Sequence, residues 1–142
     1  MMITRYANKS DTVQVISLFE QYLLKDNDAI YSEEFFCSYG MKAAIRKNQM
    51  IVAIENDLII GAMRFYRKKK QNNISLYQFA VSVPYRGRNI MMKMLELIND
   101  IDIIIKCPLS SKFNIYYQKM GWTLIRHDEI YNYWCLPSKV LL

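Results

Sequence analysis

The sequence predicts a single α/β domain of the α+β kind, with a mixed, mostly antiparallel sheet of about seven strands and about four helices. Its length of 142 residues is typical of one compact domain, so residues 1–142 are expected to fold as one unit. Three consecutive β-rich runs joined by short polar turns lie between residues 50 and 83. A strand-helix-strand unit follows them.

The composition favours a stable globular chain with an anionic partner. Hydrophobic residues make up 52% and charged residues 23% of the chain, which is close to globular averages. Lys and Arg outnumber Asp and Glu by 19 to 13, and this excess favours nucleotides, nucleic acid or acidic surfaces as partners. The sequence shows no signal peptide and no apolar run of about 18 residues. A cytoplasmic protein without a membrane partner is therefore expected.

The cysteines and the histidine argue against a metal site. Cys37, Cys107 and Cys135 are odd in number, widely spaced and without a CxxC pair, so buried free thiols are expected. His127 is the only histidine. A metal cluster built on several histidines is therefore excluded, and no metal is expected.

The N-terminal third predicts one strand and two helices. Residues 3–6 form the strand, and Ser10–Asp11 is expected to cap a helix whose apolar positions recur over residues 13–23. A second helix is predicted over residues 32–46. It carries Glu33–Glu34 in its first turn, where the positive end of the helix dipole favours carboxylates.

The middle of the chain predicts a three-stranded antiparallel meander. Residues 50–55 and 58–66 are β-rich runs separated by Asn56–Asp57, a pair that tolerates the positive φ angles of a tight hairpin. A polar turn then leads into a third strand over residues 74–83, which Pro84 ends.

The remaining elements continue the alternation of helices and strands. A helix is predicted over residues 90–98, because its apolar positions fall on one face, and a buried strand over residues 102–106. A further helix is predicted over residues 113–120, whose apolar positions also fall on one face. Two final strands are expected at residues 122–127 and 130–136.

The turn after the third meander strand is a candidate phosphate site. The chain passes from the strand directly into the helix at Ile90, so unpaired backbone N–H groups converge at the positive helix end. Arg86 and Arg88 add positive charge, and Gly87 allows close approach of a ligand to the backbone.

This turn resembles the acyl-coenzyme A signature of the GNAT acetyltransferases, which reads Arg or Gln, two residues, Gly, one residue, then Gly or Ala. Arg86 occupies the first place. Asn89 and Met91 stand where the family has its first glycine and its second small residue. Asn is the best non-glycine residue for a left-handed backbone, which suits the first of these places.

A second block is similar to the C-terminal pattern of the same family. Cys107-Pro108 is followed by Asn114, the pair Tyr116-Tyr117, and Gly121-Trp122. The order of predicted elements also agrees, so the resemblance covers essentially the whole chain. It implies the GNAT fold, with a splayed, V-shaped cofactor cleft between the strand ending at Val83 and the strand of residues 102–106.

The resemblance implies an acyl-CoA-dependent N-acetyltransferase that moves the acetyl group of acetyl-CoA to an amino group. Tyr117 is implied as the general acid, and an N–H near residues 81–83 would polarise the thioester carbonyl. The cofactor-binding residues implied are Val81, Val83, Arg86, Gly87, Arg88, Asn89, Ile90, Met91 and Asn114. No general base is evident on the strand of residues 74–83, which leaves water, no base, or a side chain elsewhere: Glu55, Glu33, Glu34 or, in principle, His127.

Three interpretations of the function stay open, and the first two differ in the acceptor. The first is a small-molecule amine or a protein amino group, for a monomer or homodimer. The second is nucleic acid or aminoacyl-tRNA, as in phage-type or toxin-type members of this fold. The basic and aromatic residues that favour it are Arg64, Arg67, Lys68, Lys69, Lys70, Tyr66 and Tyr77. The third is a non-catalytic member that binds a ligand or partner.

Overall fold

A seven-stranded mixed sheet with the strand order β1-β2-β3-β4-β5-β7-β6 forms the centre of the molecule. The computed structural model describes residues 1–22 and 37–139. Within them the strands are β1 (Met2–Tyr6), β2 (Met50–Glu55), β3 (Leu58–Lys68), β4 (Asn73–Val81), β5 (Asp102–Pro108), β6 (Thr123–His127) and β7 (Tyr131–Leu136). The helices are α1 (Thr12–Tyr22), α2 (Ser38–Arg46), α3 (Ile90–Leu95) and α4 (Phe113–Lys119). The predicted fold class and element order are confirmed.

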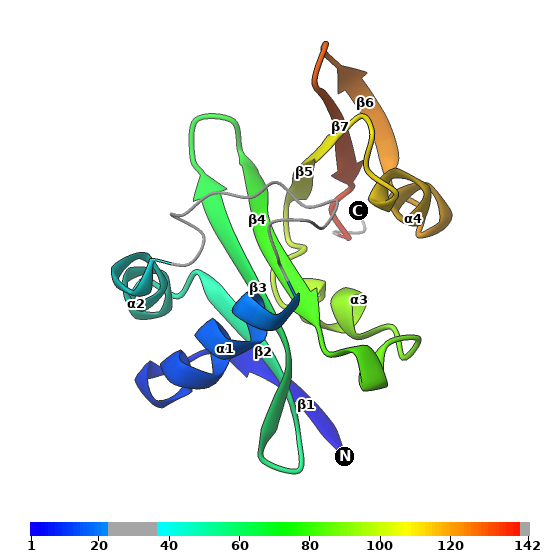
Figure 1. Cartoon of the computed structure of the whole chain (residues 1–142). Coiled ribbons are helices and arrows are strands. Elements are labelled where there is room, and N and C mark those ends of the chain that lie inside the picture. The colour runs from blue at the N-terminus through cyan, green and yellow to red at the C-terminus, as the bar shows by residue number, and fades with distance from the viewer. Residues whose placement is uncertain (23–36, 140–142) are drawn as a thin grey trace.

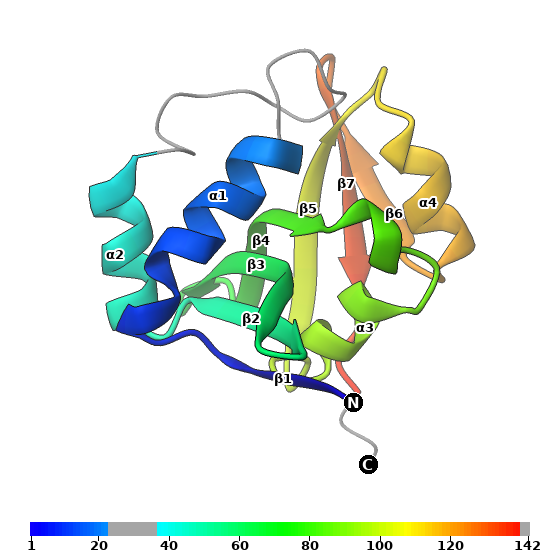
Figure 2. The ribbon, with the colours of Figure 1, turned by 60° about the horizontal axis from the view of Figure 1, so that its bottom comes forward.

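Helices cover both faces of the sheet (Figure 1). Figure 2 shows α1 and α2 on one side and α3 and α4 on the other. Strand β2 is buried on both faces, because Met50 and Val52 pack into the α1/α2 core while Ile51 and Ala53 pack into the α3/α4 core. This double burial explains why β2 reads as a continuous apolar run. No helix in the described part of the chain is long and apolar enough to cross a membrane.

A capping box precedes the first helix. Asn8 is the N-cap of a short 3-10 turn, Lys9–Asp11, that leads directly into α1 at Thr12, and its side chain accepts a hydrogen bond from the Ser10 N–H at 3.0 Å. Asp11 completes a capping box by accepting from the Asn8 N–H at 2.8 Å. The Asp11 carboxylate also forms an ion pair with Arg5 at 2.7 Å. The predicted segment Ser10–Asp11 thus lies in the capping turn, with Asp11 as the reciprocal acceptor, while Asn8 was not named from the sequence.

The second helix and its preceding cysteine also differ from expectation. Helix α2 begins at Ser38, and the predicted start at residue 32 with Glu33–Glu34 lies outside the described residues. Cys37 is the N-cap residue of α2 and is exposed, whereas Cys107 and Cys135 are buried. The expectation of a buried thiol is therefore wrong for Cys37, because an N-cap on this surface helix faces solvent.

The hairpin prediction at the middle of the chain is confirmed. Asn56 and Asp57 adopt φ angles of 52° and 62° between β2 and β3. Strand β4 ends at Val81, two residues earlier than predicted, because a short 3-10 turn over Val83–Tyr85 replaces the extended backbone.

The sheet divides between β4 and β5. Residues Asn73–Leu76 of β4 pair in parallel with Asp102–Ile105 of β5, and the pairing ends there. On the other side of β4, Arg64 pairs with Gln78 and the next residue of β3 pairs with Leu76, so Tyr77 is an extra residue in β4. Such a bulge bends its strand and increases the local twist. Beyond it β4 and β5 diverge, which gives the predicted V-shaped opening.

Helix α3 lies unusually close to β3. The missing side chain of Gly61 permits this, since a Cβ there would lie 3.2 Å from Ile90 Cγ2 and 3.3 Å from Met94 Cε. The predicted apolar face of this segment is buried in full: Ile90, Met91, Met94, Leu95 and Ile98. The close contact fixes where the preceding turn lies relative to β4.

The Arg5–Asp11 pair predicts an acid-sensitive contribution to stability. The hydrogen bond from Arg5 holds the pKa of the Asp11 carboxyl below its ordinary value, against the opposing effect of burial. A lowered folded-state pKa contributes stability that is complete above the unfolded pKa of about 3.9 and is lost as the pH falls through the folded pKa. Asp11→Asn should cost about 2 kcal/mol at pH 7 and less at pH 3, as measured by urea unfolding.

The matched control is Asp100→Asn, which removes an exposed ion pair with Arg67. It should change stability by less than about 1 kcal/mol at either pH. An Asp11→Asn loss that stays the same at pH 3 and pH 7 would contradict the ionic origin of the effect.

Candidate active site

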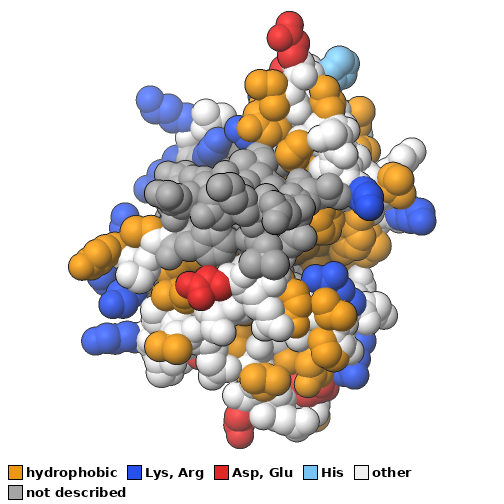
Figure 3. Space-filling view, in the orientation of Figure 1, with side chains coloured by type: hydrophobic (Ala, Val, Ile, Leu, Met, Phe, Trp, Pro, Cys, Tyr) orange, Lys and Arg blue, Asp and Glu red, His pale blue; other side chains and the backbone are white. Residues whose placement is uncertain are grey.

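A pocket of about 610 Å³ opens where β4 and β5 diverge. It is walled by the free end of β4, the turn before α3, and α4. Its lining consists of Tyr22, Phe79, Ala80, Val81, Tyr85, Arg86, Gly87, Asn89, Ile90, Met91, Phe113, Tyr116 and Met120. Figure 3 shows hydrophobic side chains beside Lys and Arg over the region between α3 and α4. This volume and largely apolar lining are typical of small-molecule and cofactor sites.

The free edge of β4 presents backbone polar groups to this pocket. The Ser82 N–H donates to the Ile60 carbonyl of β3 at 2.8 Å. Because backbone groups alternate along a strand, Phe79 and Val81 direct their N–H and C=O groups to the opposite edge. The pairing of β4 with β5 has already ended at Leu76. No residue of the described ranges 1–22 and 37–139 accepts from the N–H groups of Phe79 and Val81, so these groups are available to a ligand in the cleft.

The turn before α3 contains two left-handed residues. Gly87 has a φ of 86°, and Asn89, the N-cap of α3, has a φ of 61° and a ψ of 32°. Asn89 thus adopts the backbone that was expected from its place in the turn. A Cβ added to Gly87 would meet no atom within 4 Å. Glycine is needed here for its conformation, since the space around it is open.

The two arginines of the turn have different surroundings. Arg86 lines the pocket, where its Nε donates to the Val81 carbonyl at 3.0 Å and its guanidinium lies 5.6 Å from the centre of the Tyr22 ring. Arg88 lies outside the lining and forms an ion pair with Glu55 at 3.1 Å. Only Arg86 is therefore placed to meet a phosphate in the pocket. Glu55, a candidate base, is already paired.

Helix α4 directs one tyrosine at the pocket and the next into the core. Phe113, Tyr116 and Met120 share a helical face and line the pocket. Tyr117 is the next residue, so its side chain points in a different direction around the helix axis. It is 2% exposed, and its ring centre lies 5.3 Å from that of Trp122. Burial is the main cause that raises the pKa of Tyr117 well above 10. The residue named as general acid from the sequence therefore does not line the pocket.

Tyr116 has a hydroxyl at the pocket wall. It donates a hydrogen bond to the Met91 sulfur at 3.4 Å, and burial raises the pKa of this tyrosine. Met91 is 3% exposed and supports the wall from the core side. A thioether is a weak acceptor, so this hydroxyl can be redirected to a ligand at little cost.

Asn114 is fully engaged within the protein. Its amide nitrogen donates to the carbonyls of Pro108 at 2.8 Å and Ser111 at 2.9 Å. Its amide oxygen accepts from the side chains of Asn132 at 3.0 Å and Trp134 at 2.9 Å. The predicted cofactor ligand lies outside the pocket lining, where it fastens the start of α4 to β5 and β7.

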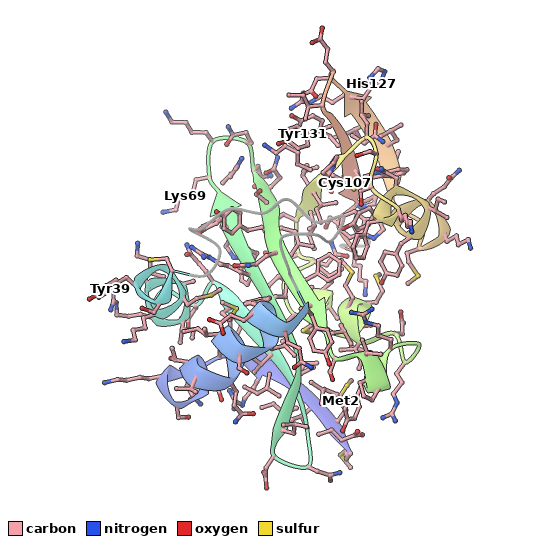
Figure 4. All side chains as sticks on the ribbon, in the orientation of Figure 1. Met2, Tyr39, Lys69, Cys107, His127 and Tyr131 are labelled. Carbon is pink, nitrogen blue, oxygen red and sulfur yellow. The ribbon has the colours of Figure 1, made fainter. Side chains whose placement is uncertain are left out.

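The structure brings together six of the residues singled out from the sequence: Val81, Arg86, Gly87, Asn89, Ile90 and Met91. Val83, Arg88, Asn114 and Tyr117 are not in the lining. Besides Tyr85, which belongs to the same turn as Arg86, the pocket is lined by residues that sequence reasoning missed: Tyr22, Phe79, Ala80, Phe113, Tyr116 and Met120. The helical spacing of residues 113, 116 and 120 was a usable signal, whereas Tyr22 is distant in sequence and gave none. Figure 4 shows His127 at the end of the β6–β7 hairpin, away from the pocket.

Sequence comparison gives no relative. No model of a known protein family matches the chain, and no curated protein matches it. Any assignment must therefore rest on the fold and on the geometry of the cleft.

The fold, in contrast, has many counterparts among solved structures. PaiA N-acetyltransferase from Thermoplasma acidophilum, in complex with coenzyme A, has a TM-score of 0.77 at 14% identity, with 96% of this chain and 99% of that chain covered. A GNAT-family acetyltransferase from Listeria monocytogenes has a TM-score of 0.74 at 14% identity, with 96% and 94% covered. Diaminobutyrate acetyltransferase EctA from Paenibacillus lautus, with 2,4-diaminobutyric acid and coenzyme A, has a TM-score of 0.69 at 14% identity, with 97% and 95% covered.

These structures match the chain over nearly its full length. Identities this low bear on the fold alone. The chain has the fold of the GNAT-family acetyltransferases.

Proposed function

We propose that the protein is an N-acetyltransferase that binds acetyl-CoA in the cleft between β4 and α4. The observation that carries the proposal is the unpaired edge of β4, where the N–H groups of Phe79 and Val81 face a pocket that ends at the Arg86 turn. The fold supports it, since similar structures hold coenzyme A.

Each wall of the pocket suits a different part of the cofactor. The turn with Arg86, Gly87 and Asn89 would hold the phosphates, which need a cation and an accessible backbone. The edge of β4 would pair with the amides of the pantetheine arm in the manner of an added strand. Phe113 of α4 would cover the arm from the other side.

The reaction is a nucleophilic acyl substitution. The acceptor nitrogen forms a bond to the thioester carbon, the C–S bond breaks, the ammonium proton passes to water, and the thiolate is protonated. An N–H of β4 aimed at the carbonyl oxygen would stabilise the developing charge, an effect of about 3 kcal/mol where such donors have been removed. Of the described pocket-lining residues none is Asp, Glu or His, so the acceptor would have to arrive neutral or lose its proton to water.

We assign protonation of the leaving thiolate to the tyrosine pair of α4. Tyr117 is the member that the family resemblance implies, and Tyr116 is the member that lines the pocket. The hydroxyl of Tyr116 already donates to a sulfur atom, so geometry favours it over the buried Tyr117.

The structure exposes fewer of the cations that favoured the nucleic-acid alternative than the sequence suggested. Arg64 is buried and Arg67 is paired with Asp100 at 3.3 Å. The exposed run Lys68–Lys70 remains at the tip of the β3–β4 hairpin, where Figure 4 shows Lys69. A salt-sensitive retention of DNA or tRNA that Lys68–Lys70 substitutions remove would favour this alternative.

Cofactor binding is tested by the two neighbouring arginines. Calorimetric titration with acetyl-CoA should show binding to the wild-type protein and about tenfold weaker binding to Arg86→Gln, because a charge-assisted contact to phosphate is lost. Arg88→Gln removes the same charge outside the lining and should leave the affinity nearly unchanged. No binding to the wild type at millimolar acetyl-CoA would sink the enzyme proposal and favour a non-catalytic protein.

The acid role is tested by Tyr116→Phe and Tyr117→Phe. Release of free thiol from acetyl-CoA, measured with a panel of amines, should fall about 100-fold in kcat for Tyr116→Phe with the KM for acetyl-CoA unchanged. Tyr117→Phe should keep most of the rate, since its hydroxyl lies in the core. The opposite ranking of the two variants would return the acid role to Tyr117.

A further inference from the structure

A buried arginine on β3 lacks partners for much of its guanidinium. Arg64 is 8% exposed, and its Nε and Nη1 atoms are buried without a hydrogen-bond partner. Among the described residues, Nη2 alone donates, to the hydroxyl of Tyr66, and no carboxylate pairs with Arg64. A buried cation without an anion is costly, and the cost falls when a ligand supplies the missing charge.

The residue opposite Arg64 is also unsatisfied. Gln78 of β4 is the register partner of Arg64, is 5% exposed, and leaves both its Oε1 and Nε2 atoms without a partner. Both residues are two positions from members of the α1/α2 core, Ala62 on β3 and Ala80 on β4, so their side chains share that face of the sheet. Four unpaired polar atoms thus lie on two directly opposed side chains.

Two aromatic rings pack against this guanidinium, and Gly40 of α2 lies beside it. The Arg64 Cζ lies 4.8 Å from the centre of the Tyr77 ring and 5.4 Å from that of Tyr66. A Cβ on Gly40 of α2 would lie 3.5 Å from Nη2. Contact with two rings orders the planar group and leaves the Nη1 donors for another partner.

This cluster adjoins the acyl-transfer pocket along β4. Ala80 lines the pocket and lies on the same face as Gln78, about 7 Å away along the strand. Between them is Phe79, whose N–H faces the cleft. The bulge residue Tyr77, where β4 leaves β5, contacts the guanidinium. A ligand bound by Arg64 and Gln78 would therefore reach the thioester position within the length of a small molecule.

We propose that Arg64 and Gln78 bind the carboxylate of the acceptor, so that the acceptor is an amine that also carries a carboxylate, such as an amino acid. This inference rests on the proposed acetyltransferase function. The unpaired Nη1 of Arg64 can donate to a carboxylate oxygen, and the Gln78 amide supplies a second donor to the same group. One buried cation and a neutral amide match a single negative charge better than a phosphate dianion.

A substitution that supplies the missing anion tests the unpaired cation directly. Gln78→Glu places a carboxylate opposite Arg64 and should raise the Tm by about 3–8 °C. Gln118→Glu makes the same change at an exposed position of α4 and should shift the Tm by far less. A Tm that falls in Gln78→Glu and not in Gln118→Glu would overturn the proposal, because Arg64 would then not be in need of an anion.

Ligand binding gives a second readout that does not depend on turnover. In the presence of coenzyme A, L-phenylalanine, L-leucine and L-glutamate should each be compared with the amine that lacks its α-carboxylate, with acetate and inorganic phosphate as simple anions. At least one amino acid, and acetate more than phosphate, should raise the wild-type Tm, while the decarboxylated amine should not. A larger effect of phosphate than of acetate would overturn the carboxylate assignment.

Arg64→Met separates a ligand-binding role from a structural one. The variant should keep or raise the Tm without ligand, since no ion pair is broken, and should lose the gain from the amino acid. Lys68→Met, which removes an exposed charge from the same hairpin, should retain that gain. A large loss of Tm in Arg64→Met would make Arg64 a structural residue and overturn the inference.

Acetyl transfer to the same amino acids, and to the amines that lack their carboxylates, tests whether the Arg64–Gln78 subsite serves the reaction. The kcat/KM for the preferred amino acid should fall about 100-fold in Arg64→Met, the scale of a lost charge-assisted hydrogen bond. A wild-type protein that binds coenzyme A but prefers no amino acid over the amine that lacks its carboxylate would overturn this inference alone. Failure to bind coenzyme A would instead overturn the proposed function.

Discussion

The architecture depends on the short pairing between β4 and β5. The two strands share a parallel ladder only over Asn73–Leu76, and the extra residue Tyr77 bends β4 immediately after it. Had the ladder continued, the N–H groups of Phe79 and Val81 would have been consumed by β5. Because it stops, the sheet contains an internal edge, and an internal edge must be satisfied by solvent or by a ligand. The pocket is the consequence of this interruption.

The turn at the end of β4 is held by packing on its far side. Helix α3 has only six residues, Ile90–Leu95, so its own hydrogen bonds do little to fix it. Gly61 lets it lie close to β3, and its buried face anchors the turn that contains Arg86 and Asn89. Asn89 supplies a left-handed backbone where the related signature uses glycine. Asn89 therefore gives this turn a left-handed residue directly before α3.

Local patterns predicted the elements well, because hairpin turns, helical faces and buried strands are encoded by neighbouring residues. What these patterns did not predict depends on distant residues. The turn that leads into α1 depends on Arg5 and Asn8 acting together with Asp11. Tyr116 and Tyr117 both fit a broad apolar face, and the packing of Tyr117 against Trp122 distinguishes the buried ring from the one that lines the pocket. The opposition of Arg64 and Gln78 requires the strand register, which no local pattern contains.

The two arms of the cleft carry different chemistry. The arm of β1–β4 holds the backbone donors, Arg86, and the buried Arg64 and Gln78. The arm of β5–β7 holds α4, which Asn114 fastens to β5 and β7 by side-chain and backbone hydrogen bonds. Tyr116 is thus supported from the opposite half of the sheet. A ligand must contact both arms to meet the backbone donors and the hydroxyl together.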